Sequence, residues 1–262
     1  MTWSTHTTGG LSYLDSGGPA RHGVLLLHSL GTDHRLWSGL DLPGHRVVVP
    51  DSRGHGASAW AEPLTVDAWA GDVERIRVDA GLDEVALVGL SMGGVQAIAY
   101  AAAHPERVTA LVIADSFAEL DPAVASQKAS GLTSRVDDMA TLADFYVSST
   151  FTVDPLPPSA EDVRAAIAGM RPEAYKASTE TCFGVQLDHA LADITAPTLV
   201  LWGDRDEKAP RELSERIAEQ IPKARLEVIP AAGHLSVLEN PDEFTRLVRE
   251  FLDGGDLDGQ HA

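Results

Sequence analysis

Short runs of apolar residues recur along the chain, separated by longer segments in which apolar residues follow helical spacing. Runs this short and this uniformly apolar predict strands buried on both faces, as in a parallel sheet covered by helices. A sixth run, residues 226–229, contains one polar residue and is expected nearer an edge of the sheet. The five uninterrupted strands are expected at residues 24–27, 47–49, 85–88, 111–113 and 198–201.

Amphipathic segments lie between the predicted strands. They are expected to be helices at residues 65–80, 92–103, 211–220 and 241–252. The strand-then-helix order predicts an α/β fold with a mostly parallel, doubly wound sheet. Ahead of this order, two β-like segments within residues 2–15 flank Gly9 and Gly10, which predicts a hairpin.

The alternation stops between residues 116 and 195, where no continuous apolar run occurs. This stretch instead has helical patterns at residues 124–136, 140–151, 160–170 and 173–184. We therefore expect a helical cap, residues 116–195, inserted after the sixth strand. The α/β core is expected to consist of residues 1–115 and 196–262.

The charge balance excludes several classes of partner. The chain has 262 residues, a formal net charge of −19 and a sequence pI of about 4.7. Such a surface repels nucleic acid and anionic membranes, so neither is expected as a partner. Cys182 is the only cysteine, which excludes an internal disulfide. Residues 1–6 lack the pattern of a secretion signal and no apolar stretch approaches membrane-spanning length, so we expect a cytoplasmic protein.

A serine stands at the point where one predicted strand gives way to a helix. Ser91 lies in the pentapeptide Gly89-Leu90-Ser91-Met92-Gly93, directly after the run at residues 85–88. Glycines two positions to either side permit the sharp turn of a nucleophile elbow, which lifts the hydroxyl clear of the sheet. The N-terminus of the following helix offers backbone N–H groups to a developing negative charge. We predict that Ser91 is a catalytic nucleophile.

A serine nucleophile needs a base and a group that orients the base. His234 follows the predicted strand at 226–229, and Asp204 and Asp206 follow the strand at 198–201. These residues and Ser91 all come at carboxyl ends of strands, where functional groups gather in parallel sheets. Asp115, at the end of the strand at 111–113, is a further alternative for the acid.

The motifs and their order, serine then aspartate then histidine, resemble the α/β-hydrolase family over almost the whole chain. The resemblance favours Asp206 as the acid, because family members place it three residues after a glycine, here Gly203. Some relatives place their acid at the position of Asp115. The resemblance also implies that the backbone N–H groups of Leu30 and Met92 form the oxyanion hole.

A narrower resemblance concerns substrate. The segment His28-Ser29-Leu30-Gly31-Thr32-Asp33, continuing to Trp37, is similar to the corresponding loop of 3-oxoadipate enol-lactonases, enzymes of aromatic compound catabolism. It implies a small lactone or ester that carries a carboxylate, for which a cation is needed. Three cap residues could supply that cation, namely Arg135, Lys128 and Lys176. Substrate contacts are therefore expected from Ser29, Arg135 and Trp37.

Two other functions fit the same motifs. One is a broad short-chain carboxylesterase or perhydrolase. The other is a ligand receptor of this fold that keeps the triad and turns over slowly. Neither a metal-ligand spacing nor a glycine-rich cofactor loop occurs in the sequence, so we expect no metal and no cofactor. Oligomeric state has no recognisable signature in the chain.

Overall fold

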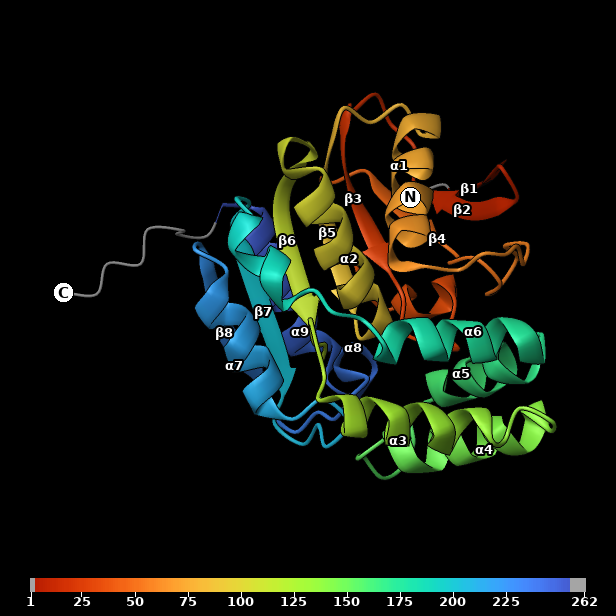
Figure 1. Ribbon diagram of the computed structural model, residues 1–262. Coiled ribbons are helices and arrows are strands. Elements are labelled where there is room, and N and C mark those ends of the chain that lie inside the picture. Colours follow the sequence, from red (N-terminus) through yellow and green to blue (C-terminus); the bar gives the residue numbers. More distant parts are fainter. Residues whose placement is uncertain (1–2, 255–262) are drawn as a thin grey trace.

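One eight-stranded sheet organises the protein, whose computed structural model describes residues 3–254 (Figure 1). The strand order is β1-β2-β4-β3-β5-β6-β7-β8. The pairs β1–β2 and β2–β4 are antiparallel and the remaining pairs are parallel, so the expected doubly wound sheet with its hairpin is confirmed. The strands are Ser4–Thr8 (β1), Leu11–Asp15 (β2), His22–Leu27 (β3), Val47–Pro50 (β4), Glu84–Leu90 (β5), Val108–Ala114 (β6), Thr198–Gly203 (β7) and Ala224–Ile229 (β8).

Both faces of the sheet are buried, which explains the uninterrupted apolar runs. Successive side chains of a strand point to opposite faces. Leu25 and Leu27 of β3 belong to the apolar cluster that also contains residues of α1 (Val66–Asp79), α2 (Met92–Ala103) and α7 (Arg211–Gln220). Their neighbours Val24 and Leu26 pack in the cluster that contains α9 (Pro241–Leu252). Strand β8 is an edge strand and is half-buried along most of its length, as its polar residue predicted.

Four helices form the cap between β6 and β7 and lie across the carboxyl ends of the strands (Figure 1). Helix α3 begins two residues earlier than the apolar pattern indicated, because Asp121 accepts the backbone N–H groups of Ala123 and Val124 and Pro122 occupies the first helical position. The cap helices are Pro122–Thr133 (α3), Met139–Thr150 (α4), Ser159–Ala168 (α5) and Pro172–Phe183 (α6).

Several short helical elements had no counterpart in the pattern analysis. They are too short to show a helical period, so only their turn residues could have indicated them. They are η1 (His34–Trp37), η2 (Pro105–Arg107), η3 (Asp188–Asp193) and α8 (Ser236–Glu239).

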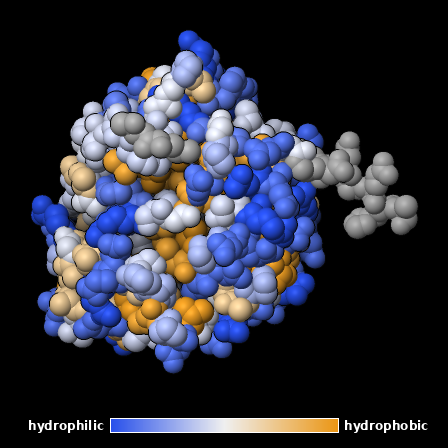
Figure 2. Space-filling model, turned by 180° about the vertical axis from the view of Figure 1, so that it is seen from behind, coloured by the Kyte–Doolittle hydropathy of each residue, from blue (hydrophilic) through white to orange (hydrophobic). Residues whose placement is uncertain are grey.

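The surface is predominantly hydrophilic on the face shown in Figure 2, where hydrophobic side chains gather in a hollow and are ringed by polar ones. This surface agrees with the high net charge of the chain. Among residues 3–254, none of the helices has both the length and the apolar character needed to cross a membrane.

Candidate active site

Ser91 occupies a strained turn between β5 and α2. Its backbone angles are φ 55° and ψ −115°, an uncommon conformation for a residue with a side chain. The Ser91 N–H donates to the carbonyl of Ala114 at 2.9 Å, and the hydroxyl of Ser116 donates to the Ser91 carbonyl at 2.7 Å. These bonds to the last residue of β6 and to the loop that follows β6 hold the turn in place.

The two glycines of the elbow are required by backbone contacts. A Cβ atom on Gly93 would overlap the carbonyl group of Leu27 at the end of β3, and one on Gly89 would overlap the carbonyl of Gly93. The elbow therefore packs backbone against backbone, with no room for a side chain at either position. This contact brings the start of α2 directly against the loop after β3.

His234 and Asp206 complete a hydrogen-bonded chain with Ser91. The Ser91 Oγ lies 2.9 Å from His234 Nε2, and His234 Nδ1 lies 2.8 Å from Asp206 Oδ2. All three residues are buried, and each comes from a different strand end. The other oxygen of the acid, Oδ1, accepts the backbone N–H groups of Lys208 at 2.8 Å and Ala209 at 3.0 Å. These two bonds orient the carboxylate toward the imidazole.

The alternative acids lie elsewhere. Asp204 is exposed, and Asp115 is fully buried beneath the site. Asp115 accepts the backbone N–H of Gly203 at 2.8 Å and is hydrogen-bonded to the hydroxyl of Ser236. Burial and the negative charge of Asp206 raise the pKa of Asp115 well above its usual range. Of the carboxylates in residues 3–254, only Asp206 is hydrogen-bonded to His234.

The loop after β3 is fixed by its own hydrogen bonds. His28 Nε2 accepts the backbone N–H of Ser52 at 2.9 Å, so the proton of a neutral ring is on Nδ1, which donates to the Ser29 carbonyl at 2.8 Å. Complete burial lowers the pKa of His28 and keeps the ring neutral. The Ser29 carbonyl also accepts the Thr32 hydroxyl at 2.8 Å. Histidine 28 is thus a structural brace for this loop.

The two expected oxyanion donors are available for a ligand. Neither the Leu30 N–H nor the Met92 N–H has a hydrogen-bond acceptor within the part of the chain that the structure describes. Met92 is the first residue of α2, where an N–H has no partner inside the helix. Leu30 follows the braced Ser29 carbonyl and lines the pocket beside Ser91.

A cavity of about 270 Å³ lies over Ser91, between the core and the cap. Its walls are mostly apolar, and it is small enough to accept only a small molecule. The core contributes Leu30, Ser91, Lys208 and His234; the cap contributes Phe117, Gln127, Lys128, Gly131, Leu132, Arg135, Phe145, Tyr146, Cys182 and Phe183.

The expected substrate contacts are only partly brought to this cavity. Arg135 lines it, with its guanidinium 4.2 Å from the centroid of the Phe145 ring. The prediction that Trp37 contacts substrate was wrong. Helix η1 turns this side chain into the core, where it is 3% exposed and its ring centroid lies 6.1 Å from that of Phe244. Ser29 does not line the cavity either, because its hydroxyl is buried behind Tyr146, at 3.5 Å from the Tyr146 hydroxyl.

Lys176, a third cation considered for the substrate, also lies outside this cavity. It is exposed on α6 and pairs with Glu180 one turn along the helix, at 4.0 Å. Cys182 does line the cavity, and burial raises the pKa of its thiol to about 12, which makes it a poor nucleophile.

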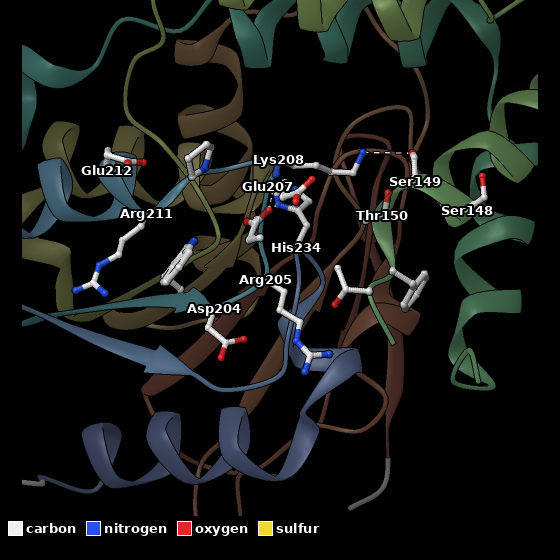
Figure 3. A pocket seen from close by; sticks show the side chains of 15 residues that line it. Ser148, Ser149, Thr150, Asp204, Arg205, Glu207, Lys208, Arg211, Glu212 and His234 are labelled. Atoms are coloured by element: carbon white, nitrogen blue, oxygen red, sulfur yellow. Dashed lines mark hydrogen bonds and ion pairs between the residues drawn. The ribbon is translucent and has the colours of Figure 1, made fainter. Parts of the chain in front are cut away.

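Lys208 is the pocket residue that sequence reasoning missed. It lines the cavity and also a wider outer groove of about 890 Å³, where its ammonium group reaches toward Ser149 of α4 (Figure 3). The three cations expected from the sequence all belong to the cap, whereas Lys208 belongs to the core loop that carries Asp206. Its place two residues after the acid, at the carboxyl end of a strand, was the available signal.

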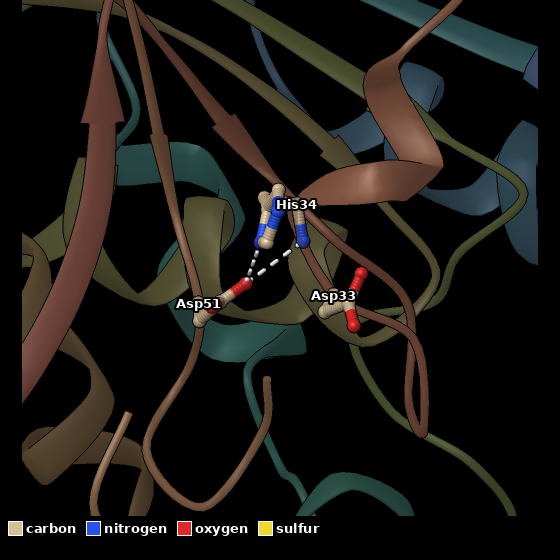
Figure 4. Close-up of side chains that lie close together, drawn as sticks. All are labelled: Asp33, His34 and Asp51. Carbon is tan, nitrogen blue, oxygen red and sulfur yellow. Dashed lines mark hydrogen bonds and ion pairs between the residues drawn. The ribbon is translucent and has the colours of Figure 1, made fainter. Parts of the chain in front are cut away.

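A cluster of potential metal ligands lies apart from the hydrogen-bonded chain of Ser91, His234 and Asp206. Ligand atoms of Asp33, His34 and Asp51 lie within 4.8 Å of one another, although their sequence spacing suggested no site (Figure 4). Asp51 accepts both the backbone N–H of His34 at 2.8 Å and its ring Nδ1 at 2.9 Å. Asp33 is paired with Arg35 at 2.7 Å. These internal bonds account for all three side chains as loop supports.

Comparison with known proteins places the chain in a broad group. A family model described as the alpha/beta hydrolase fold matches residues 24–241. The enol-lactonase of Burkholderia xenovorans LB400 has a similar structure, with a TM-score of 0.85 and 28% identity over 95% of this chain and 100% of its own. A thermophilic esterase from Thermogutta terrifontis, solved with malate bound, has a TM-score of 0.86 and 29% identity over 97% and 99% of the two chains. A pimeloyl-acyl-carrier-protein methyl ester esterase of Neisseria meningitidis serogroup A is 27% identical over 88% of this chain and 77% of its own length.

Proposed function

The chain belongs to the α/β-hydrolase fold family, and we propose that it is a serine hydrolase that cleaves a small carboxylic ester or lactone through an acyl-enzyme. The observation that carries the proposal is the hydrogen-bonded chain from Ser91 through His234 to Asp206, which opens into a small, mostly apolar cavity. This arrangement meets the geometric requirement of a serine nucleophile with an oriented base.

In the first step, Ser91 Oγ attacks the substrate carbonyl carbon while its proton passes to His234 Nε2, 2.9 Å away. Asp206, held by two backbone N–H groups, orients the ring and stabilises the imidazolium that forms. The negative charge on the carbonyl oxygen is received by the N–H groups of Leu30 and Met92. Collapse of this intermediate breaks the carbon–oxygen bond, and the imidazolium protonates the leaving oxygen.

In the second step, water replaces the leaving group. His234 accepts a proton from the water, whose oxygen attacks the acyl carbon, and the proton is then delivered to Ser91 Oγ as the acid product leaves. With a lactone, the leaving oxygen stays attached to the acyl group through the opened ring. The whole substrate must then fit the cavity at once, which suits its volume of about 270 Å³.

The narrower proposal is an enol-lactonase-like substrate, with a broad short-chain esterase as the alternative. The loop from His28 to Trp37 supports the lactonase, as does the similar fold of the Burkholderia enol-lactonase. One relative is named as an esterase of a pimeloyl-acyl-carrier-protein methyl ester, and another esterase was solved with malate, a small dicarboxylate, bound. A cation in the cavity is the feature that such substrates need.

Steady-state hydrolysis of 3-oxoadipate enol-lactone and of 4-nitrophenyl acetate tests both levels of the proposal. Ser91→Ala serves as the blank, and Ser134→Ala, an exposed serine on the cap, serves as the matched control. Efficient lactone turnover with weak ester turnover supports the lactonase; the reverse supports the esterase. Single or very slow turnover of both would contradict a hydrolase and indicate a ligand receptor.

A further inference from the structure

Positive charge gathers without negative partners around one cavity. The chain is strongly acidic, and most of its 20 lysine and arginine side chains are paired with carboxylates. Lys128, Arg135 and Lys208 all line the cavity over Ser91, and none of them forms an ion pair with a carboxylate of residues 3–254. Three cations without a carboxylate partner among the described residues are therefore grouped where a ligand would enter.

Lys208 is the most deeply placed of the three. Its side chain is half-buried, and its ammonium group has only neutral partners, the Ser149 hydroxyl at 3.4 Å and the ring of Tyr146, 5.5 Å from the centroid. Burial lowers the pKa of Lys208, and the charge of Lys128 lowers it further, while Asp206 acts in the opposite direction. A lysine in this position lacks the compensation that buried charges usually have.

Lys128 adds a second positive charge from the cap side of the cavity. It projects from α3, and its ammonium group donates to the Lys208 carbonyl at 3.0 Å. Two like charges are thereby held in one region, which is unfavourable unless an anion lies between them. Arg135 is more exposed, and its guanidinium lies over the Phe145 ring, so it is placed at the outer part of the cavity.

We propose that Lys208, assisted by Lys128, forms an anion subsite in the cavity and that the natural substrate is an ester or lactone whose acyl group ends in a carboxylate. The proposal rests on the hydrolase function proposed above and names its substrate class. A carboxylate there would accept the Lys208 ammonium donors and offset the mutual repulsion of the two lysines. The apolar part of the lining includes Leu132, Phe117 and Phe183, which suit the short apolar chain between the carboxylate and the reacting carbonyl.

Lys208 also links this subsite to the catalytic acid. Its backbone N–H donates to Asp206 Oδ1 at 2.8 Å while its side chain extends into the cavity. One residue thus contacts both the catalytic chain and the far end of the substrate. Arg135, which the sequence favoured as the carboxylate anchor, becomes a secondary contact at the entrance.

Two esters of the same leaving group test the proposal. Mono-4-nitrophenyl adipate has a terminal carboxylate, and 4-nitrophenyl hexanoate has the same number of acyl carbons and no charge. We expect the ratio of their kcat/KM values, charged over neutral, to fall roughly 10- to 100-fold in Lys208→Met, the range of one charge-assisted hydrogen bond. Lys208→Arg should restore part of the ratio, and Lys128→Met should lower it less. Lys223→Met, an exposed lysine far from the cavity, is the matched control.

A binding measurement separates the subsite from the chemistry. Adipate binding to Ser91→Ala, followed by calorimetry, should weaken about 10-fold or more when Lys208→Met is added. Equal kcat/KM for the two esters in the unmodified protein, or an unchanged ratio in Lys208→Met, would overturn the subsite while leaving the hydrolase intact. Failure to hydrolyse either ester would contradict the proposed hydrolase function. Adipate binding would then still show whether the anion subsite exists.

Discussion

The two walls of the cavity over Ser91 are built in opposite ways. The core wall is rigid: Ser91, Asp206 and His234 are each at most 7% exposed, and every one is held by hydrogen bonds. The cap wall begins with α3, none of whose residues is fully buried, and it includes the exposed side chains of Arg135 and Phe145. We therefore expect the core wall to determine the proposed reaction, and the cap wall, together with Lys208 of the core, to determine which substrates enter.

This difference follows from what each wall packs against. Helix α2, behind the nucleophile, is buried along nearly its whole length between strands and α1, so small displacements there disturb close-packed neighbours. Helix α3 contacts mainly α6 and otherwise faces solvent or the cavity. Substitutions should therefore lose activity steeply on the core wall and only gradually on the cap wall.

Removal of the proposed nucleophile should have the largest effect. Ser91→Ala leaves His234 with no group to activate, and we expect kcat for 4-nitrophenyl acetate to fall roughly 10,000-fold or more. Circular dichroism and the thermal midpoint should stay close to those of the unmodified protein. Residual turnover within tenfold of normal would place the nucleophile elsewhere.

Identical substitutions at three aspartates should differ sharply. Asp206→Asn keeps the shape of the side chain but disfavours the correct tautomer of His234, so kcat should drop roughly 1,000- to 10,000-fold without unfolding. Asp204→Asn, on the exposed neighbour, should leave kcat within about twofold, because surface changes away from a site are nearly neutral. Near-normal activity in Asp206→Asn would transfer the role to another carboxylate.

Asp115→Asn should act on stability and its pH dependence more than on kcat. The folded protein raises the pKa of Asp115, so the stability tied to its proton is complete below the unfolded pKa of about 3.9 and is lost as pH rises through the folded pKa. Asparagine cannot titrate but can still bond Gly203 and Ser236. The variant should therefore gain unfolding free energy relative to the unmodified protein as pH rises.

Denaturant unfolding of both proteins at pH 5 and pH 8 checks this expectation. The expectation fails if the difference in unfolding free energy between the two proteins is the same at both pH values, or if the variant is relatively less stable at pH 8. Either result would mean that Asp115 is held ionised in the folded state. A large loss of kcat in Asp115→Asn would instead give this carboxylate a part in the reaction.

The smallest effects are expected on the cap surface. Arg135→Met should raise KM for mono-4-nitrophenyl adipate by roughly two- to fivefold with little change in kcat, because an exposed cation contributes little to binding. Lys176→Met should change neither value, since Lys176 lies outside the cavity beside Glu180. A change in kcat as large as that of a core variant would erase the distinction between the two walls.

The sequence predicted the core wall far better than the cap wall. Uninterrupted apolar runs mark buried strands, and Gly89 and Gly93 mark the elbow, because backbone packing there allows no other residue. These are local signals. The choice among Asp115, Asp204 and Asp206 needed a family resemblance, since all three follow strands and only three-dimensional geometry shows which one meets His234.

The direction in which a side chain points outside regular helices and strands could not be predicted from the sequence. Trp37 has the same neighbours in sequence whether it faces the cavity or the core; contact with Phe244, more than 200 positions away, decides. Lys208 was overlooked for the converse reason. Its side chain reaches Ser149 and Tyr146 of a helix that precedes it by some 60 positions, and no sequence period connects them.

The backbone contact between Gly93 and the Leu27 carbonyl bears on how this protein can change through descent or in the laboratory. The spacing between the nucleophile and the loop with Leu30 is set by main-chain atoms, which are the same for every amino acid. Any substitution at Gly93 would add a Cβ atom that overlaps the Leu27 carbonyl, so changes at this contact should be lost in selection. Improved variants for new substrates should therefore accumulate in α3 and α4. Screening libraries are best confined to the positions on those helices that face the cavity.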